Sequence, residues 1–308
     1  MAYRVERALA PCAILLLVMA CDMPAVNIKG TYDYLKDHSQ VIDALWDTEI
    51  AEHAVAYSLV SNEVQLKAIP EYEPALIAMI NGYAGYGSYW LMEKKERAEA
   101  EGNFDQAARI NQRAGILFDR VAMYGRQILR LRDDGFDQAL SRGWDAVSEW
   151  IEDNFYRKAD AEVLTVTGLA FVLPMMSSSE GMAAVAERPL AEMLLQRAVE
   201  LNPASRHALA LQVLGTLDCS TPAAVGGNPR RGLVRLEAAA AITRRRSLGI
   251  LVAIAERCAV ALQDQKMFRR LLTEVIEAED SEDFRLWNKF ARYKAERLLK
   301  QEDELFFE

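Results

Sequence analysis

The sequence contains few of the residues from which catalytic and metal centres are built. Its only histidines are His38, His53 and His207, and no two of them have a metal-ligand spacing such as HExxH. A phosphate-binding Walker loop, a dinucleotide-binding GxGxxG turn and a GxSxG nucleophile motif are also missing. We therefore predict that the protein is not an enzyme and has no catalytic residue, bound metal or cofactor.

Positive charge is scarce as well. The 36 lysines and arginines are outnumbered by 45 aspartates and glutamates, which gives a formal net charge of -9. Such a protein repels the phosphate backbone, so nucleic acid is not an expected partner. No segment alternates apolar and polar residues with a period of two, so no strands are expected. Hydrophobic content of 51% in 308 residues is enough for a packed helical core.

No apolar run is long enough to span a bilayer. The first one, from Ala13 to Ala20, follows Arg4 and Arg7. It is far shorter than the ~20 residues that a membrane span needs. A short apolar run after positive charges is typical of a signal peptide, which we place at residues 1–20.

Residues Val18 to Cys21 resemble the bacterial lipobox, in which the cysteine is diacylated and becomes the new N-terminus. We expect a lipid on Cys21, a tether over residues 21–39 and a location in the periplasm. An ordinary signal peptide that is cleaved nearby is the alternative. Asp22 favours the inner membrane in enteric bacteria, although the outer membrane is also open.

The body, residues 40–308, is expected to form one helical domain. Ala191, Leu195, Ala198 and Pro203 have the spacing of the second helix of a tetratricopeptide unit, which ends at a proline. Residues 211–215 suit the next helix. The GGNP stretch then offers Asn228 as a helix cap and Pro229 as a first helical residue.

An earlier copy of the repeat begins at Gly102-Asn103-Phe104 and continues with Ala107 and Ala114. We predict a tetratricopeptide-like bundle or solenoid of roughly ten or more helices. Generic alanine-rich helices are the alternative. Single helices are expected over 137–153 and over 160–175, the second buried on most sides. The first should carry Leu140, Trp144, Val147 and Ile151 on one side.

Residues 40–67 are also expected to be helical, because apolar side chains recur there at helical intervals. The recurring residues are Ile42, Leu45, Ile50, Ala54, Tyr57 and Val64.

Aromatic residues form a stripe in the helix expected from about residue 74 to 98. Tyr83, Tyr86 and Trp90 share one face. If this helix and 160–175 line a cavity, its aromatic wall includes these three with Tyr89 and Phe171, and its polar groups are Asn81, Ser88 and Thr167. The other interpretation is that these side chains only fill the core.

Six arginines cluster in this otherwise acidic chain: Arg230, Arg231, Arg235, Arg244, Arg245 and Arg246. One interpretation is a contact with an acidic partner or a carboxylate ligand. The other is that the last three only complement the dipole at a helix C-terminus. Cys219 and Cys258 lie near corresponding ends of consecutive helices, and either a disulfide or two buried thiols fit them.

Several stretches together resemble the T-component lipoproteins of tripartite ATP-independent periplasmic (TRAP) transporters. The stretches are GYAGY at 82–86, LLQRAVELNP at 194–203, GGNPRRGLVRLEAAAAI at 226–242 and the helix at 251–276. The resemblance implies a periplasmic helical protein with tetratricopeptide-like repeats and a pore or cavity. It also implies association with the solute-binding P subunit and a possible homotrimer.

The function expected from these observations is that of a lipid-anchored accessory component of a TRAP transport system. It would bind the P subunit and pass a small organic ligand through a pore. A protein-interaction scaffold of the cell envelope with no transport role is the alternative, because helical repeats bind many kinds of partner.

The first prediction concerns the anchor. Replacing Cys21 with Ala removes the acylated thiol, so the protein should move from the membrane fraction to the soluble periplasmic fraction. Fractionation followed by detergent partitioning measures this. If the variant still partitions with detergent, the anchor lies elsewhere.

Overall fold

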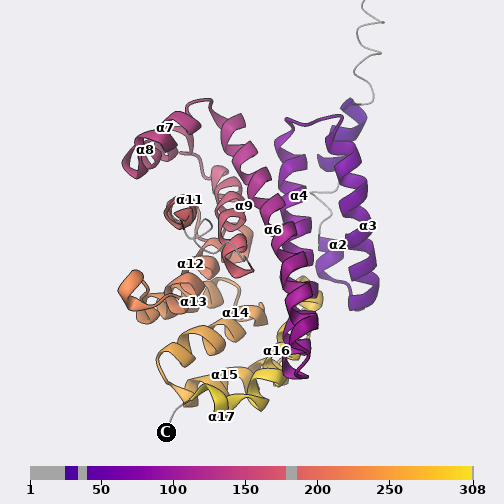
Figure 1. Ribbon diagram of the computed structural model, residues 1–308, viewed down its shortest axis with the longest axis vertical. Coiled ribbons are helices and arrows are strands. Elements are labelled where there is room, and N and C mark those ends of the chain that lie inside the picture. The colour runs from indigo at the N-terminus through magenta and orange to yellow at the C-terminus, as the bar shows by residue number, and fades with distance from the viewer. Residues whose placement is uncertain (1–24, 34–39, 178–185, 307–308) are drawn as a thin grey trace, which may run out of the picture.

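The computed structural model describes residues 25–33, 40–177 and 186–306 (Figure 1). Within them every regular element is helical and none is a strand, so the predicted all-α fold is confirmed. Cys21, Asp22 and the signal peptide lie outside the described residues. The tetratricopeptide-like arrangement of the repeats stays a prediction.

The N-terminal part begins with a helical segment over 25–33, within the expected tether, whose Tyr32 is buried in the core. The helices that follow are α2 (Gln40–Asp43), α3 (Thr48–Leu66), α4 (Glu73–Gly85), the π-helical turn η1 (Tyr86–Leu91), α5 (Met92–Ala100) and α6 (Phe104–Arg132).

The middle contains α7 (Phe136–Arg142), α8 (Trp144–Asn154), α9 (Asp160–Val172), η2 (Leu173–Met176), α11 (Arg188–Leu201), η3 (Ser205–Ala208), α12 (Leu209–Ser220), η4 (Ala223–Val225) and α13 (Pro229–Ile242). The C-terminal part contains α14 (Leu248–Ala253), η5 (Ile254–Ala259), α15 (Gln265–Glu277), η6 (Glu282–Phe284), α16 (Arg285–Lys300) and α17 (Glu302–Leu305).

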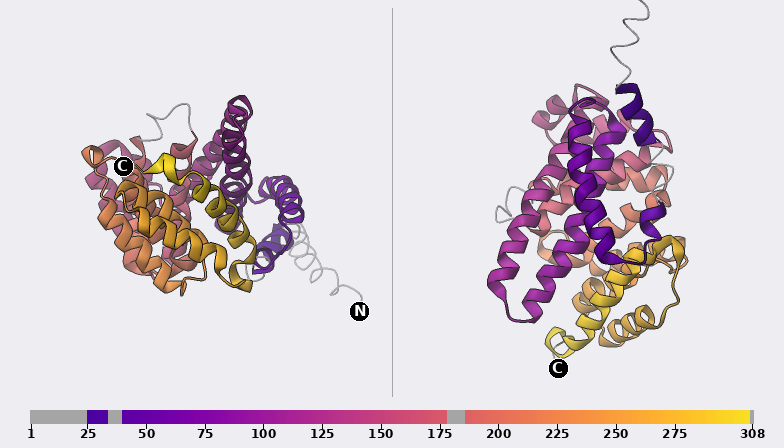
Figure 2. Two further views of the ribbon diagram at one scale, coloured as in Figure 1. Left: turned by 90° about the horizontal axis from the view of Figure 1, so that it is seen from below. Right: turned by 90° about the vertical axis from the view of Figure 1, so that its right-hand side faces the viewer.

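The chain turns back on itself so that α16 contacts the N-terminal helix α2. Helices α3, α4 and α6 form a layer on one side, and α7 to α13 stack on the other (Figure 1). Helices α14 to α17 follow below, where α16 returns to the N-terminal part (Figures 1 and 2). The contact of α16 with α2 includes a hydrogen bond of 2.6 Å from Trp287 Nε1 to Asp43 Oδ1.

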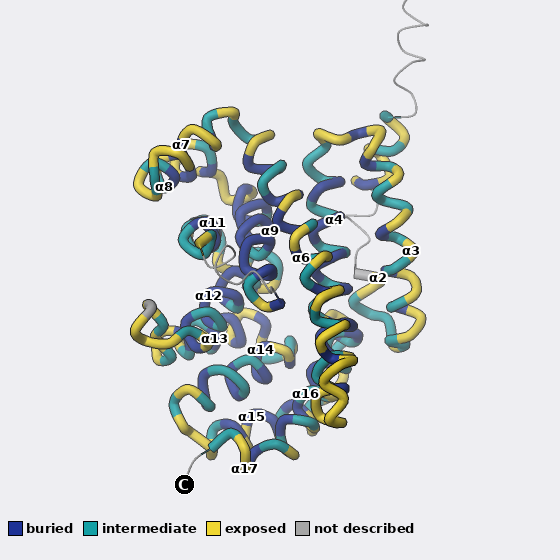
Figure 3. Tube along the Cα trace, viewed as in Figure 1, coloured by how far each residue is buried: buried dark blue, intermediate teal, exposed yellow. Residues whose placement is uncertain are grey.

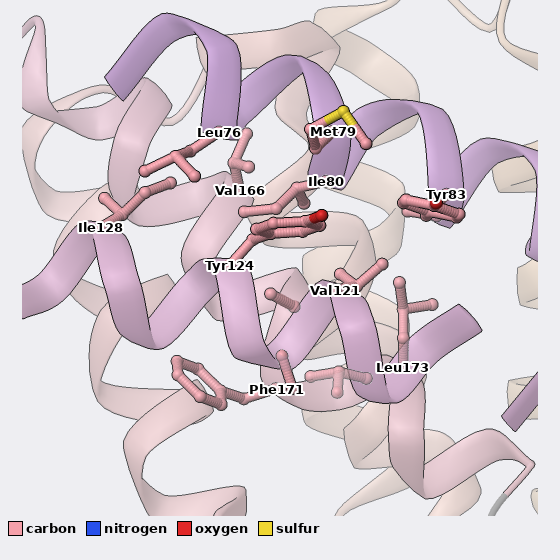
Figure 4. Close-up of a cluster of buried hydrophobic side chains, with 14 of the residues drawn as sticks. Leu76, Met79, Ile80, Tyr83, Val121, Tyr124, Ile128, Val166, Phe171 and Leu173 are labelled. Carbon is pink, nitrogen blue, oxygen red and sulfur yellow. The ribbon is translucent and has the colours of Figure 1, made fainter. Parts of the chain in front are cut away.

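Helix α9 is the centre of the larger hydrophobic core. Nearly all of its residues are buried, as predicted for this segment (Figure 3). It packs on α6 and α11, and α4 covers α6 from the other side (Figure 4). A second core lies among α12 to α16.

The α12–α13 pair confirms the helices, cap and loop predicted around GGNP. Asn228 Oδ1 accepts from Arg231 N at 3.0 Å, and Pro229 is the first residue of α13. Gly227 is required there, because a Cβ at this position would lie 1.8 Å from Thr221 O. The two helices also cross at Gly232, where a Cβ would lie 2.6 Å from Gly215 O.

Cys219 and Cys258 form a disulfide with a Cα–Cα distance of 4.9 Å. Of the two arrangements that the sequence allowed, the bridge is therefore the one found. It links α12 to η5 across 39 residues and closes the second core.

The single helix expected over 137–153 is wrong, because α7 and α8 are separated at Gly143. This glycine has φ 104° and ends α7. The four residues predicted to share one side are therefore divided: Leu140 and Trp144 are 37% and 40% exposed, whereas Val147 and Ile151 are buried.

The helical segment predicted over 40–67 is found as α2 and α3, which are separated by residues 44–47. The buried side chains of α3 are Ala51, Val55, Leu59 and Leu66. The recurring residues Ile42, Ile50, Ala54, Tyr57 and Val64 are exposed, and Leu45 is half-buried. The reason is that α3 carries apolar residues on two faces, and periodicity alone cannot tell which one packs inward.

The junction between α8 and α9 depends on a buried carboxylate. Asp160 pairs with Arg132 and Arg157 and accepts from the Arg157 backbone N at 2.9 Å. Burial acts to raise the pKa of Asp160. The hydrogen bonds and charges of the two arginines outweigh burial and lower this pKa to about 2.

The second prediction compares two glycines that are two residues apart, on different sides of the helix. A Cβ on Gly87 would lie 2.4 Å from Cε1 of the fully buried Phe118, whereas nothing lies within 4 Å of one on Gly85. Gly87→Ala should lower the free energy of unfolding by about 2 kcal/mol. Gly85→Ala should raise it by up to ~1 kcal/mol. Urea titrations decide this, and equal effects would refute the packing described at Gly87.

The third prediction concerns acid stability. Since the folded pKa of Asp160 is below the usual 3.8, its contribution is complete above pH 4 and is lost as pH falls toward 2. Asp160→Asn should cost about 3 kcal/mol at pH 7, because Arg132 is left buried without its partner. The difference from wild type should shrink between pH 4 and pH 2. Asp137→Asn, which changes an exposed pair with Arg130, should change stability by less than about 0.5 kcal/mol at each pH.

Candidate functional site

The aromatic stripe predicted on α4 and η1 points its polar tips at α3. Tyr83 donates to Glu63 Oε1 at 2.8 Å, Tyr86 donates to Glu52 Oε1 at 3.3 Å, and Trp90 Nε1 donates to Thr48 O at 3.0 Å. All three side chains are buried. The stripe therefore exists, and its hydrogen-bonding atoms are already occupied by α3.

Glu63 is the most heavily bonded of these acceptors. It takes hydrogen bonds from Tyr83, from Tyr124 at 2.9 Å and from Arg120. Burial acts to raise the pKa of Glu63, but the three donors outweigh it and lower the pKa. Conversely, burial and the adjacent carboxylate raise the pKa of Tyr83 to about 12. The group is thus a neutral tyrosine pair and a cation around a fixed carboxylate.

The other residues proposed for a cavity wall lie in two further surroundings. Tyr89 turns toward α16, where its ring centroid lies 4.4 Å from that of Trp287. Phe171 and Thr167 are fully buried in the core, and Thr167 Oγ1 donates to Val163 O at 2.8 Å. Ser88 on η1 is half-buried.

Asn81 belongs to a polar cluster that was not predicted from the sequence. Its Oδ1 accepts from Arg206 Nη2 at 3.1 Å, and Arg206 also pairs with Glu162. Arg206 reaches this position from a left-handed turn in which Arg206, His207 and Ala208 all have positive φ. Burial lowers the pKa of Arg206. No local sequence signal indicates a contact between residues 125 positions apart.

The eight cavity-wall residues therefore do not share one surrounding: they contact α3, α16, the core around α9 or Arg206 of η3, and Ser88 is half-buried. None of them lines either of two clefts found among the described residues. Their role as a ligand or pore wall stays a prediction.

The better-defined cleft, of about 360 Å³, lies between α8, α11, α12 and α13. Its volume falls within the range of small-molecule sites. Its lining is mostly polar: Ser148, Ile151, Glu152, Glu192, Met193, Gln196, Arg197, Glu200, Leu214, Asp218, Arg231 and Arg235.

Asp218 fixes the positive wall of this cleft. This buried carboxylate accepts from Arg231 Nε at 3.0 Å and from Arg235 Nη1 at 2.7 Å. Asp218 O also accepts from Asn228 N at 2.9 Å, so the same residue holds the GGNP loop. The two guanidinium groups are thereby rigid, and each keeps an exposed part of its side chain.

The six arginines do not form one patch. Arg230, Arg231 and Arg235 lie in the first half of α13, and Arg244 to Arg246 follow its C-terminus. Arg245 pairs with Glu274 and Glu237, and Arg246 pairs with Asp283. Within the described residues, Arg230 and Arg244 are exposed and form no ion pair. They are the cations left for a partner.

The described residues contain no group of three metal-ligating side chains, and none of their helices is long and apolar enough to cross a membrane. The arrangement offers chemistry for recognition through fixed guanidinium groups, buried tyrosines and a polar cleft.

Comparisons with known proteins give the family. No curated protein matches the chain significantly. The family model described as TRAP transporter T-component matches residues 46–306, which is most of the chain and nearly all of its described body. This family is one of transporter accessory components rather than of enzymes. The chain belongs to the TRAP transporter T-component family.

Proposed function

We propose that this T component is a lipid-anchored periplasmic protein that binds the solute-binding P subunit of its TRAP transporter and passes a small organic ligand. The observation that carries the proposal is the family match over residues 46–306. The lipobox-like sequence before Cys21 supports the anchor.

The outward face of α13 is the surface that we assign to the partner. Arg230, Val234, Ala238 and Ala241 recur there at helical spacing, all are exposed, and Arg244 follows beyond the helix end. Small residues let another protein approach the backbone closely. Unpaired cations at both ends favour an acidic partner surface.

The polar cleft beside this face supports the same assignment. Arg231 and Arg235 are held by Asp218 before a partner arrives, so little side-chain entropy is lost on binding. Acidic groups of the partner can therefore meet cations on α13 and at the rim of the cleft.

An interaction scaffold of the cell envelope with no transport role is the second candidate. One observation favours it: four of the five aromatic residues expected to line a pore either have their polar tips bonded to α3 or are buried in the core. The fifth, Tyr89, packs on Trp287 of α16. A scaffold needs only an exposed surface of stacked helices.

The fourth prediction tests the partner surface. The purified protein should bind its cognate solute-binding protein with a micromolar dissociation constant. Charge reversal at the two unpaired cations, Arg230→Glu with Arg244→Glu, should weaken binding by roughly 10-fold or more and reduce its salt dependence. Calorimetry at several salt concentrations measures both effects.

The matched control carries the same charge change at two exposed arginines outside α13, Arg109→Glu with Arg142→Glu. It should bind like wild type. Equal weakening by both double variants would mean that only net charge matters. If wild type shows no binding at micromolar concentration, the scaffold function is the one that stands.

A further inference from the structure

Helix α3 presents an apolar face to solvent. Ile50, Tyr57, Val60 and Val64, with Trp46 just before the helix, are between 56% and 78% exposed. Steps of three, four and seven residues place these side chains on one side of the helix. Figures 1 and 3 show α3 at the outer edge of the fold, with α4 behind it. Single exposed apolar residues are ordinary on a protein surface, but a continuous set on one helix marks an interaction site.

Exposed apolar side chains are concentrated in the N-terminal part of the described chain. Eight of the 21 large apolar side chains that are exposed among the described residues fall between Val26 and Val64. The remaining thirteen are spread over residues 89–293, on many different elements. The surface that covers this apolar region is therefore expected to be one that only the N-terminal part meets.

The helical segment over 25–33 is held beside the C-terminal end of α3. Tyr32 is buried, and its hydroxyl donates to Asn62 O at 3.4 Å. Tyr72, at the start of α4, donates to Asp33 Oδ1 at 2.6 Å. The segment thus has a defined place, at the same outer edge of the fold as α3 (Figures 1 and 2).

The reach of the chain brings a membrane close to this edge. Cys21, the residue acylated in the proposed function, precedes Ala25 by four residues. Four residues span at most about 14 Å when fully extended. The inference below rests on that proposed anchor, because acyl chains on Cys21 hold the segment over 25–33, and α3 beside it, near the bilayer.

We propose that the outer face of α3 lies on the membrane surface, with its apolar side chains in the headgroup region. Trp46 and Tyr57 are of the aromatic type that gathers at membrane interfaces, where one end of the side chain is apolar and the other is wet. The exposed His53 lies on the same side and also has a polar tip that suits the headgroup level. The acyl chains and α3 together then fix the orientation of the whole domain.

The face needs no positive charge of its own for this contact. Helices that bind membranes unaided carry lysines or arginines, and α3 has none between Thr48 and Leu66. Here the acyl chains already hold the protein at the bilayer, so the contact of α3 is intramolecular and occurs at a high effective concentration. Because the contact is apolar, salt should not weaken it.

The fifth prediction measures the accessibility of residue 57. Lipidated Tyr57→Cys protein, added to preformed phosphatidylethanolamine–phosphatidylglycerol vesicles, is compared with the same variant of the soluble chain from Asp22 to Glu308, which keeps every described residue. Cys219 and Cys258 are bridged, so the introduced thiol is the one that reacts. Its reaction with a membrane-impermeant charged maleimide should be at least about 10-fold slower on vesicles, at low and at high salt, because the interface buries it.

Tyr156→Cys is the matched control. Tyr156 is 67% exposed and follows directly after α8, at the opposite edge from α3 (Figure 1). Its thiol should react at the same rate in both forms. A second variant tests whether the apolar character of the face matters: Tyr57→Glu, with Val64→Cys as the reporter, should bring the rate on vesicles back toward that of the soluble chain, because a carboxylate leaves the interface for water.

The outcomes separate this proposal from the anchor itself. Lipidated protein that floats with the vesicles while its residue 57 thiol reacts as fast as in the soluble chain would overturn the contact and leave the proposed anchor standing. Slow reaction in both forms would also overturn the contact, because another protein surface would then cover the face without any membrane. A wild-type chain that does not float with vesicles would overturn the anchor and the contact together.

Discussion

The fold depends on a set of ion pairs that joins the C-terminal helix α16 to α5 and η5. Lys294 of α16 lies 3.0 Å from Glu96 of α5 and 2.9 Å from Glu256 of η5. Arg297, one turn later, pairs with Glu93 at 2.9 Å and also with Glu96. These groups are largely shielded from water, so their net gain over desolvation is small, but breaking one partner is costly. Their main consequence is to fix where α16 lies against α5.

With α16 held against α5, helices α3 and α13 form two separate edges of the molecule. The C-terminal helices close the chain from below, and α3 and α13 are left at opposite edges (Figures 1 and 2). The α3 edge is apolar and almost free of charge, whereas the α13 edge carries arginines beside a polar cleft. The two edges therefore present different chemistry to solvent.

Local chemistry made much of this fold predictable from the sequence. The GGNP loop, the Asn228 cap and the buried faces of α9 and α11 follow from turn residues and periodicity, which act over a few positions. Long-range pairing does not follow from them. The contact of Arg206 with Asn81, and the separation of the six arginines by the length of α13, depend on how helices stack. The orientation of α3 does not follow either, because both of its faces carry apolar residues and periodicity does not tell which one packs inward.

The contacts of α3 also define what a ligand at the aromatic stripe would need. The donors there are Tyr83, Tyr124 and Arg120, and all three are bound to one carboxylate, Glu63. A ligand that reaches them must displace α3 and offer an oxygen anion in place of Glu63, or else leave buried donors without partners.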